Sequence, residues 1–286
     1  MVPFAWSLRR QRELEKCPRS FYYRYYGARG GHEAGVADRR TRRLSLCRDR
    51  VSREQYLQRV IDLAMRESFY APEGAPFASL FQRAERILRR EFDIMLLGGD
   101  NGASRHQPML EEVADPALRP EALLRELCAQ LEERCKVLMK GDWERVTRVP
   151  APCRRHLPEV VEVHVGELVC HAPVALMWQE RGTTFLVEGV RRVPEGDAAE
   201  LAALLHRYYA LSLPGADAGK VASLAFDEKG KLTEFGAGLE VSRALRKLRA
   251  GADRLGEFHG LPEAAYPRNP EACAKCFFRR ECAAGD

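Results

Sequence analysis

Four cysteines lie at the two ends of the 286-residue chain, and they constrain its fold more than any other feature. Cys17 follows a predicted helix, and Cys273, Cys276 and Cys282 form a Cys-x2-Cys-x5-Cys motif near the C-terminus. Cysteines spaced this closely are typical of metal or cluster ligands, and four thiolates suit either a [4Fe–4S] cluster or a tetrahedral zinc ion. In both cases the motif predicts that the N-terminal helix and the C-terminal segment are neighbours in space.

Buried free thiols or disulfides are the alternative interpretation of these four residues. The other cysteines are scattered and bring the total to 9, an odd number, and we recognise no signal peptide. Both observations favour a reducing, cytoplasmic environment over a disulfide framework. Because none of the others pairs at ligand spacing, we expect them to fill the core; they are Cys47, Cys128, Cys135, Cys153 and Cys170.

The composition is that of an ordinary globular protein, with 45% hydrophobic and 30% charged residues. No apolar run approaches the ~20 residues that a membrane helix requires, so we expect no membrane partner. The net charge of +5 is unevenly distributed, because arginines crowd the first 45 residues. This composition excludes a disordered or membrane-spanning chain and directs attention to the basic N-terminal block.

The arginines of this block alternate with a run of aromatic residues, Phe21-Tyr-Tyr-Arg-Tyr-Tyr. Arginine can grip phosphates while aromatic rings stack on bases, so the pattern predicts contact with DNA. The candidate nucleic-acid residues are Arg9, Arg10, Arg19, Tyr22 and Arg24. The alternative is a solvated arginine face on a helix whose aromatic rings pack inward.

Periodicity predicts mainly helices first and a small sheet afterwards. Helices are expected over 7–26, with a turn at Cys17-Pro18, and over 53–69, 76–96 and 121–140, while the polar segment 98–116 is expected to be a loop. Strands are expected at 145–149, 160–165, 168–178 and 183–190, with a hairpin at Gly182. A helix at 198–213, strands at 220–226 and 231–236, and a helix at 240–258 follow.

This element order, together with Cys-Pro-Arg-x-Phe-Tyr-Tyr near the start and Cys-x2-Cys-x5-Cys near the end, resembles the iron-sulfur branch of the RecB-like PD-(D/E)XK nucleases. The resemblance implies a restriction-endonuclease-like α/β core, a small mixed sheet flanked by helices. It also implies that the four cysteines hold a [4Fe–4S] cluster rather than zinc. We expect one integrated domain, made of a helical region 1–142 with Cys17, a core 143–260 and a cysteine-rich tail 261–286.

Nucleases of this superfamily hold Mg²⁺ or Mn²⁺ with acidic residues on a hairpin, and a lysine two residues after the second acid assists the attacking water. By resemblance, Glu188 corresponds to the second acid, but Val190 occupies the lysine position. The first acid falls near Val174, where there is no carboxylate. Asp62 takes the place of a helical histidine, and Leu205 precedes Tyr209 where the family has Gln-x3-Tyr. Glu188 and Asp62 are therefore the remaining catalytic candidates.

A displaced metal site is an alternative, because Glu162, His164, Glu167 and His171 lie close together in sequence. Glu162 and His164 share one face of a predicted strand and could share a metal ion. The same alternation is what any half-buried strand shows, and we favour that simpler interpretation.

These observations lead us to expect a catalytically inactive RecB-like protein with a structural cluster, which binds nucleic acid or serves as a subunit of a DNA repair or defence complex. An active Mg²⁺- or Mn²⁺-dependent DNA nuclease with substituted ligands is the first alternative. A pure protein-interaction subunit is the second.

Overall fold

The computed structural model describes residues 5–31, 33, 35, 38–71, 79–97, 108–114, 117, 119–158, 160–190, 193–214 and 220–283. These residues form a mixed α/β structure with several small sheets. The chain divides into two compact units, each assembled from separate stretches of sequence. Unit 1 comprises Met1–Ser7, Leu57–Glu91 and Glu121–Ala250, and unit 2 comprises Leu8–Tyr56, Phe92–Pro120 and Gly251–Asp286. The units therefore cut across the boundaries expected at residues 142 and 260.

The strands of unit 1 form two sheets. The smaller sheet has the order β1-β5-β4, with β1 (Ala5–Trp6), β4 (Val161–Val165) and β5 (Leu168–Ala172). The larger sheet has the order β6-β7-β8-β9, with β6 (Leu176–Glu180), β7 (Thr183–Val190), β8 (Val221–Phe226) and β9 (Leu232–Phe235). Because β7 and β8 are parallel and the outer pairs antiparallel, the larger sheet is small and mixed.

A tight turn connects β6 to β7 and confirms the hairpin predicted at Gly182. Arg181 and Gly182 have φ angles of 49° and 78°, as a two-residue hairpin turn with positive φ at both positions requires. The turn pairs Glu180 with Thr183 and Trp178 with Phe185. The single strand expected over 168–178 is instead two strands, β5 and β6, because Pro173 lies between them and cannot donate to a ladder.

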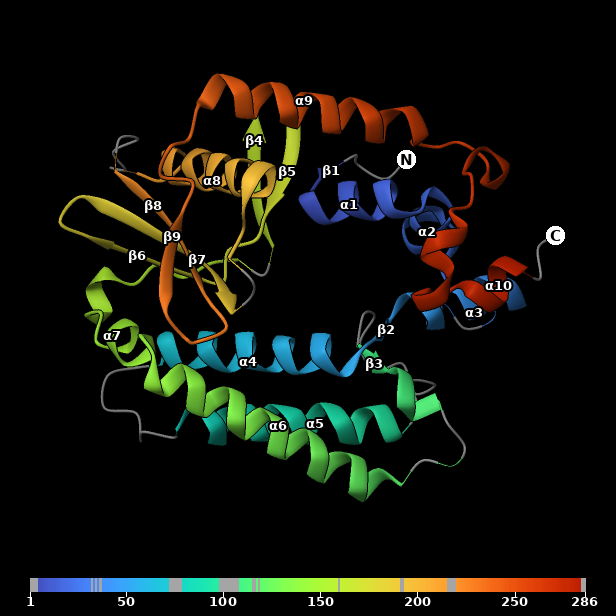
Figure 1. Cartoon of the computed structure of the whole chain (residues 1–286), viewed down its shortest axis with the longest axis horizontal. Coiled ribbons are helices and arrows are strands. Elements are labelled where there is room, and N and C mark those ends of the chain that lie inside the picture. Colours follow the sequence, from blue (N-terminus) through green and yellow to red (C-terminus); the bar gives the residue numbers. More distant parts are fainter. Residues whose placement is uncertain are drawn as a thin grey trace. The chain divides into compact units, whose positions relative to one another are not determined.

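Unit 1 also contains several helices. They are α4 (Arg53–Phe69), α5 (Leu80–Leu96), α6 (Pro120–Lys140), α7 (Trp143–Thr147), α8 (Gly196–Leu211) and α9 (Val241–Phe258), of which α4, α5, α6 and α9 extend into unit 2. Figure 1 shows α8 on one face of the sheet and α4 on the other. Three alanines of α8 pack on Ala225 and Phe235. No helix in the described part of the chain combines the length and apolar character needed to cross a membrane.

The prediction of a strand at 145–149 was wrong, because this segment begins with the short helix α7. Trp143, Val146 and Val149 are 2%, 1% and 8% exposed, so every third residue is buried. That interval is helical rather than the alternation of a strand. The neighbouring arginines, Arg145 and Arg148, are exposed.

Unit 2 combines the N-terminal stretch from Leu8 with the C-terminal stretch from Gly251. Its elements are α1 (Leu8–Lys16), α2 (Pro18–Tyr22), a π-helical turn (Tyr23–Gly27), α3 (Arg39–Arg48), the parallel pair β2 (Arg50–Val51) and β3 (Met109–Leu110), and α10 (Arg279–Ala283). Short 3-10 turns occur at Glu111–Ala114, Glu263–Ala265 and Pro270–Lys275. The turn predicted at Cys17-Pro18 is confirmed, whereas α3 and β3 were not predicted.

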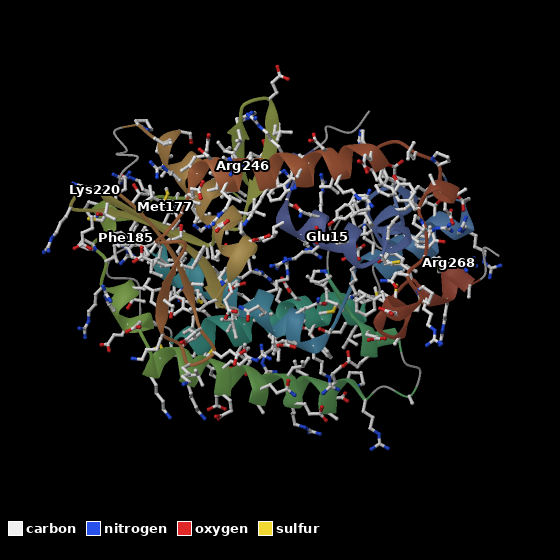
Figure 2. The ribbon with its side chains drawn as sticks, turned by 45° about the horizontal axis from the view of Figure 1, so that its top comes forward. Glu15, Met177, Phe185, Lys220, Arg246 and Arg268 are labelled. Carbon is white, nitrogen blue, oxygen red and sulfur yellow. The ribbon has the colours of Figure 1, made fainter. Side chains whose placement is uncertain are left out.

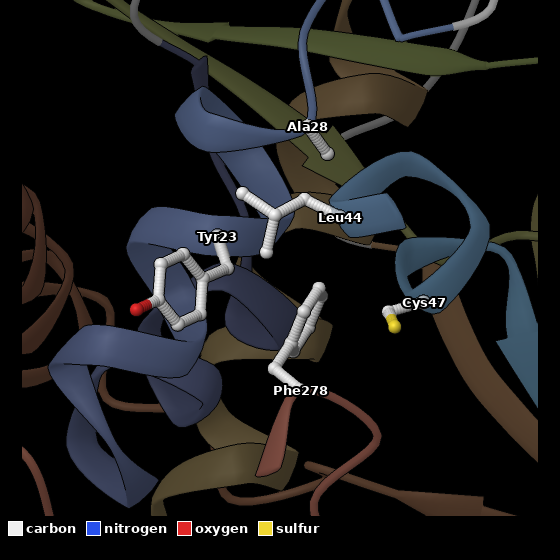
Figure 3. Close-up of a cluster of buried hydrophobic side chains, with 5 residues drawn as sticks. All are labelled: Tyr23, Ala28, Leu44, Cys47 and Phe278. Atoms are coloured by element: carbon white, nitrogen blue, oxygen red, sulfur yellow. The ribbon is translucent and has the colours of Figure 1, made fainter. Parts of the chain in front are cut away.

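Tyr266 is the centre of an aromatic core in unit 2. It is fully buried, and its ring centroid lies 4.9 Å from that of Tyr22, 6.3 Å from that of Tyr26 and 6.5 Å from that of Phe21. A second cluster contains Tyr23, Ala28, Leu44, Cys47 and Phe278 (Figure 3). The aromatic run of the N-terminal block therefore packs against the C-terminal segment.

Glu263 joins three side chains of the N-terminal segment. Its carboxylate accepts hydrogen bonds from Arg40 (2.7 Å), Tyr23 (2.8 Å) and Arg19 (3.1 Å). Partial burial alone would raise the pKa of Glu263, but the bonds from Arg40 and Tyr23 and the charge of Arg19 outweigh it, so this pKa lies below its ordinary value. The ends of the chain are thus neighbours within unit 2, as the cysteine motif predicted.

We expect Glu263→Gln to destabilise the protein at pH 7 by about 1–3 kcal/mol, because it removes charged hydrogen bonds from a part-buried site. The folded-state pKa is depressed, so this stability is present above the unfolded pKa and is lost as pH falls through the folded pKa. Urea unfolding at pH 7 and at pH 3 measures the difference. The exposed Glu133→Gln on α6 serves as control and should change little; equal effects of the two variants at pH 7 would contradict the account.

Candidate metal centre

Cys17 occupies the break between α1 and α2. Pro18 has no N–H and cannot continue α1, so the helix ends at Lys16 and Cys17 adopts an extended backbone with φ −163° at the start of α2. The N–H of Cys17 still donates to the carbonyl of Glu13 at 3.0 Å. The carbonyl of Cys17 accepts the N–H of Phe21 at 3.0 Å, and the residue is buried, 7% exposed.

The other three cysteines are held by consecutive turns. The Asn269 side chain accepts a hydrogen bond from the N–H of Glu271 and opens the turn that contains Cys273. Cys276 N–H donates to the Cys273 carbonyl at 3.2 Å, and Cys282 N–H donates to the Phe278 carbonyl at 2.8 Å. Cys276 and Cys282 also pack against the Phe278 cluster shown in Figure 3.

All four cysteines line one hollow in unit 2. About 280 Å³ of empty space, counting the part open to solvent, lies between its walls, and almost none of it is wide enough for a water molecule. The thiols and aromatic rings that line the hollow are therefore packed closely around this space. The remaining walls are formed by Ser20, Tyr23, Arg268, Ala272, Phe278 and Arg279.

The thiols interact with one another and with nearby polar groups. The pKa of Cys276 is raised, first by burial and then by Cys17 and Cys273, while the Phe278 backbone and the Ser20 hydroxyl oppose the rise. Arg268 donates a hydrogen bond to the Cys282 carbonyl. Arg268 and Arg279 thus bring two positive charges to a hollow whose other ionisable lining groups are the four thiols and Tyr23.

The donor set of this hollow fits a thiolate-bound centre. Neither a carboxylate nor an imidazole lines it, and soft thiolates suit iron-sulfur clusters or zinc. Among the described residues, no three His, Cys, Asp or Glu side chains converge closely enough to hold one metal ion. The four thiols share the hollow without meeting at a single point.

The other five cysteines lie apart from this hollow or only border its packing. Cys47, Cys135 and Cys170 are buried, and Cys128 and Cys153 are half-buried. Burial raises the pKa of Cys135 to about 12 and that of Cys170 to about 11, so both stay protonated at neutral pH. Their prediction as core residues is confirmed for the three buried thiols.

Glu188, the expected second acid, lies inside unit 1 rather than on an open surface. It is 4% exposed, and its Oε1 is 4.0 Å from Nε2 of the fully buried His206 on α8. Nδ1 of His206 lies 3.0 Å from Oγ of Ser223 on β8, which is hydrogen-bonding distance. Glu188 therefore belongs to a buried polar chain between the sheet and α8.

Asp62, the second catalytic candidate, lies against the residue after Glu188. Its Oδ1 is only 2.5 Å from where a Cβ on Gly189 would be, and Gly189 has φ +94° at an irregularity of β7. Gln58 donates a hydrogen bond to the same oxygen at 3.0 Å. Asp62 of α4 therefore contacts β7 one residue away from Glu188, but the two carboxylates have different neighbours, Gln58 and His206.

The other positions of the expected nuclease site carry no acid or lysine. Val174, at the first-acid position, donates its N–H to the Ala172 carbonyl in the connection between β5 and β6. Leu205 and Tyr209 of α8 are 1% and 9% exposed and belong to the core.

The displaced metal site is not formed. The valines of β4 are buried and its polar residues exposed, the alternation of a half-buried strand. Glu162 pairs with His171 across β4 and β5, with 3.6 Å between Oε1 and Nε2, but His164 lies opposite Val169. Within the described residues no third ligand joins the pair.

Most of the predicted nucleic-acid residues make contacts inside unit 2. Arg19 binds Glu263 and the Tyr266 carbonyl, and Arg24 binds the Arg48 carbonyl. Tyr22 packs on Tyr266, and the Arg10 guanidinium lies 5.0 Å from the Tyr25 ring centroid. The inward packing of the aromatic rings is therefore what the structure shows.

An exposed basic stripe remains on α1. Arg9, Arg12 and Lys16 are all exposed, and their spacing places them on one face of the helix. Of these three, only Arg9 was predicted as a nucleic-acid residue. Arg12 and Lys16 are added because they are exposed, whereas the predicted Arg19 and Arg24 bind partners within unit 2. We call these three residues the α1 stripe.

Sequence reasoning missed the residues that support both sites. Arg268 and Arg279 line the cysteine hollow, and their proximity to the motif in sequence was an available signal. His206 directly follows the apolar run Leu201–Leu205 of α8, which marks it as a residue that would need a polar partner if it were buried. No comparable signal pointed to Ser20 or Ser223.

Comparison of the chain with models of protein families, with curated proteins and with solved structures found no match.

Proposed function

We propose that this chain is a RecB-like nuclease-fold protein that has a degenerate catalytic site and binds DNA. In this proposal a [4Fe–4S] cluster links the two ends of the chain, and its ligands are Cys17, Cys273, Cys276 and Cys282. The observation that carries the proposal is the lining of one hollow by cysteines from both ends of the chain. The proposed role of the cluster is structural.

The surroundings of the hollow support a thiolate-bound cluster. Iron-sulfur clusters are held by four cysteine thiolates, and their net charge is negative. Arg268 and Arg279 line the hollow and would offset that charge. Such a centre would close a loop of more than 250 residues, and closing a long loop restricts the unfolded chain strongly.

Loss of hydrolytic activity is supported by what surrounds Glu188 and Asp62. A hard divalent ion needs several oxygen ligands and keeps some of its water. Glu188 is buried beside His206, and neither Val174 nor Val190 can supply the missing ligand or lysine. We infer that the polar chain of Glu188, His206 and Ser223 now stabilises the packing of α8 on the sheet.

DNA binding is supported by the α1 stripe. Three exposed cations on one helix face suit the spacing of backbone phosphates, which attract arginine and lysine regardless of base sequence. The alternative role, a protein-interaction subunit of a repair or defence complex, would use the same surface without a steep dependence on salt.

A second candidate function is a metal-dependent nuclease with substituted ligands, because Asp62 and Glu188 flank the same bend of β7. Cleavage of DNA by the wild type with Mn²⁺ that is abolished by Glu188→Gln would favour this candidate over the inactive one.

We expect Cys276→Ser to reduce bound iron and to lower stability by about 2–5 kcal/mol, the range found when a structural crosslink or metal is lost from a fold. Iron content and urea unfolding, measured on anaerobically purified protein, report both effects. Cys153→Ser, a half-buried cysteine of unit 1, is the matched control and should keep wild-type iron. Wild-type stability in Cys276→Ser would contradict the staple.

We expect the combined variant Arg9→Gln, Arg12→Gln and Lys16→Gln to bind single-stranded DNA more weakly and to reduce the slope of log K against log salt by about 2, since each lost phosphate contact contributes about 0.7. Fluorescence anisotropy between 50 and 300 mM salt, roughly the range where such contacts dominate, gives the slope. The same charge change at Arg125, Arg134 and Lys140 on α6 is the control. An unchanged slope in the α1 variant would show that the stripe does not contact DNA.

A further inference from the structure

A second hollow lies in unit 1, and none of its lining residues belongs to the cysteine hollow or to the pair Glu188 and Asp62. It has a volume of about 280 Å³ and is formed by α7 and the segment that follows it, together with β6, β7 and β9. Its apolar walls include Val146, Val149 and Leu232, with Trp178 and Phe185 from the β6–β7 hairpin. We call it the ring hollow. Its volume is at the lower end of the range of small-molecule sites, so it suits one flat ring rather than a large ligand.

Two aromatic rings give the ring hollow a stacking surface. Trp178 and Phe185 are paired across the hairpin, with ring centroids 4.9 Å apart and planes only 10° from parallel. Trp178 is 5% exposed and held firmly in the sheet, whereas Phe185 is half-buried. A planar ligand can therefore extend the stack on the more exposed Phe185.

Charged side chains of both signs surround these rings. Arg145, Arg148 and Glu180 all line the ring hollow and are exposed. Arg148 is paired with Glu144 at 2.6 Å, while no ion pair of Arg145 is present among the described residues. Lys220 lies outside the lining: its carbonyl accepts the N–H of Thr184, and its ammonium group is close to Gly182 in the hairpin turn. Figure 2 shows Lys220 and Phe185 at the same end of the sheet.

We propose that the ring hollow takes one unpaired nucleobase of a single DNA strand. The base would stack on Phe185, as bases do on aromatic side chains of single-strand-binding proteins. Glu180 can accept a hydrogen bond from an N–H group on the edge of the base, and Arg145 can bind the adjoining phosphate. A flat ring, an N–H edge and a phosphate occur together in a nucleotide, whereas an aliphatic ligand would leave Arg145 and Glu180 unused. This inference rests on the proposed DNA binding and adds a base-contacting site to it.

The test compares a ten-residue oligothymidine with an abasic strand of the same length, using fluorescence anisotropy with labelled strands. Wild-type protein should bind oligothymidine at least about five times more tightly, the lower end of what stacking one base contributes. Phe185→Leu should remove this preference, and Phe185→Tyr, which keeps a ring, should retain it. Arg145→Gln should weaken binding of both strands, and Arg125→Gln on α6 is its charge-matched control.

Equal binding of the two strands by wild-type protein would contradict the binding of a nucleobase in the ring hollow. It would leave the proposed binding of the DNA backbone by the α1 stripe intact. A preference that survives in Phe185→Leu would also overturn it, because the base would then be stacked elsewhere. Failure to bind either strand at low salt would overturn both this inference and the proposed DNA binding. Binding of an acidic, tyrosine-containing peptide that is lost in Phe185→Leu, while DNA binding is unchanged in that variant, would assign the hollow to a protein partner and overturn the nucleobase.

Discussion

The packing of the N-terminal segment against the C-terminal segment is the constraint on which unit 2 depends. Glu263 accepts bonds from Arg19, Tyr23 and Arg40, and the buried ring of Tyr266 packs on three aromatic residues of the N-terminal run. More than 220 residues separate these partners in sequence, so forming the contact closes a long loop and costs chain entropy. The cysteine hollow lies beside this contact, where a covalent centre would reinforce it most.

Each of the two units contains an internal polar network of its own. In unit 2, cations from the arginine-rich block satisfy one part-buried carboxylate, which ties helices α2 and α3 to the segment after α9. In unit 1, Glu188, His206 and Ser223 form a nearly solvent-free chain between β7, β8 and α8. Glu188, which a nuclease of the RecB-like type would direct at a metal ion, is here part of the interior. The exposed charged and aromatic side chains on which the proposals rest belong to the α1 stripe and the ring hollow.

Periodicity in the sequence was sufficient to predict the long elements. The helix α4, the strand β7 and the C-terminal end of α9 match their predicted limits. The two helices each bury one regular face, and β7 is a short, mostly buried run between the hairpin turn and the irregularity near Gly189. Helix α7 was mistaken for a strand, since five residues with two valines fit both periods until Trp143 is included. Helix α3 was missed because it is rich in arginine and its apolar face is short, consisting of Leu44 and Cys47. That face can be identified only in the structure, where Phe278 packs on it.

The candidate sites were predictable to different degrees. Cysteine spacing alone placed the chain ends together, because four thiols close in sequence motifs have few other uses. It did not reveal that Arg19 and Arg24 are occupied, since whether an arginine faces solvent depends on partners such as Glu263 that lie far away in sequence. The ring hollow was equally hidden, because its rings meet only after the hairpin register pairs Trp178 with Phe185.

The central claim is that the four cysteines hold an iron-sulfur cluster, and the most direct measurement is the iron, sulfide and zinc content of anaerobically purified protein together with its visible absorption spectrum. The account predicts about four iron and four sulfide per chain and the broad visible absorption of a cubane cluster, lost on exposure to a chelator and oxidant. One zinc per chain, or a colourless protein without metal that is fully folded, would contradict it.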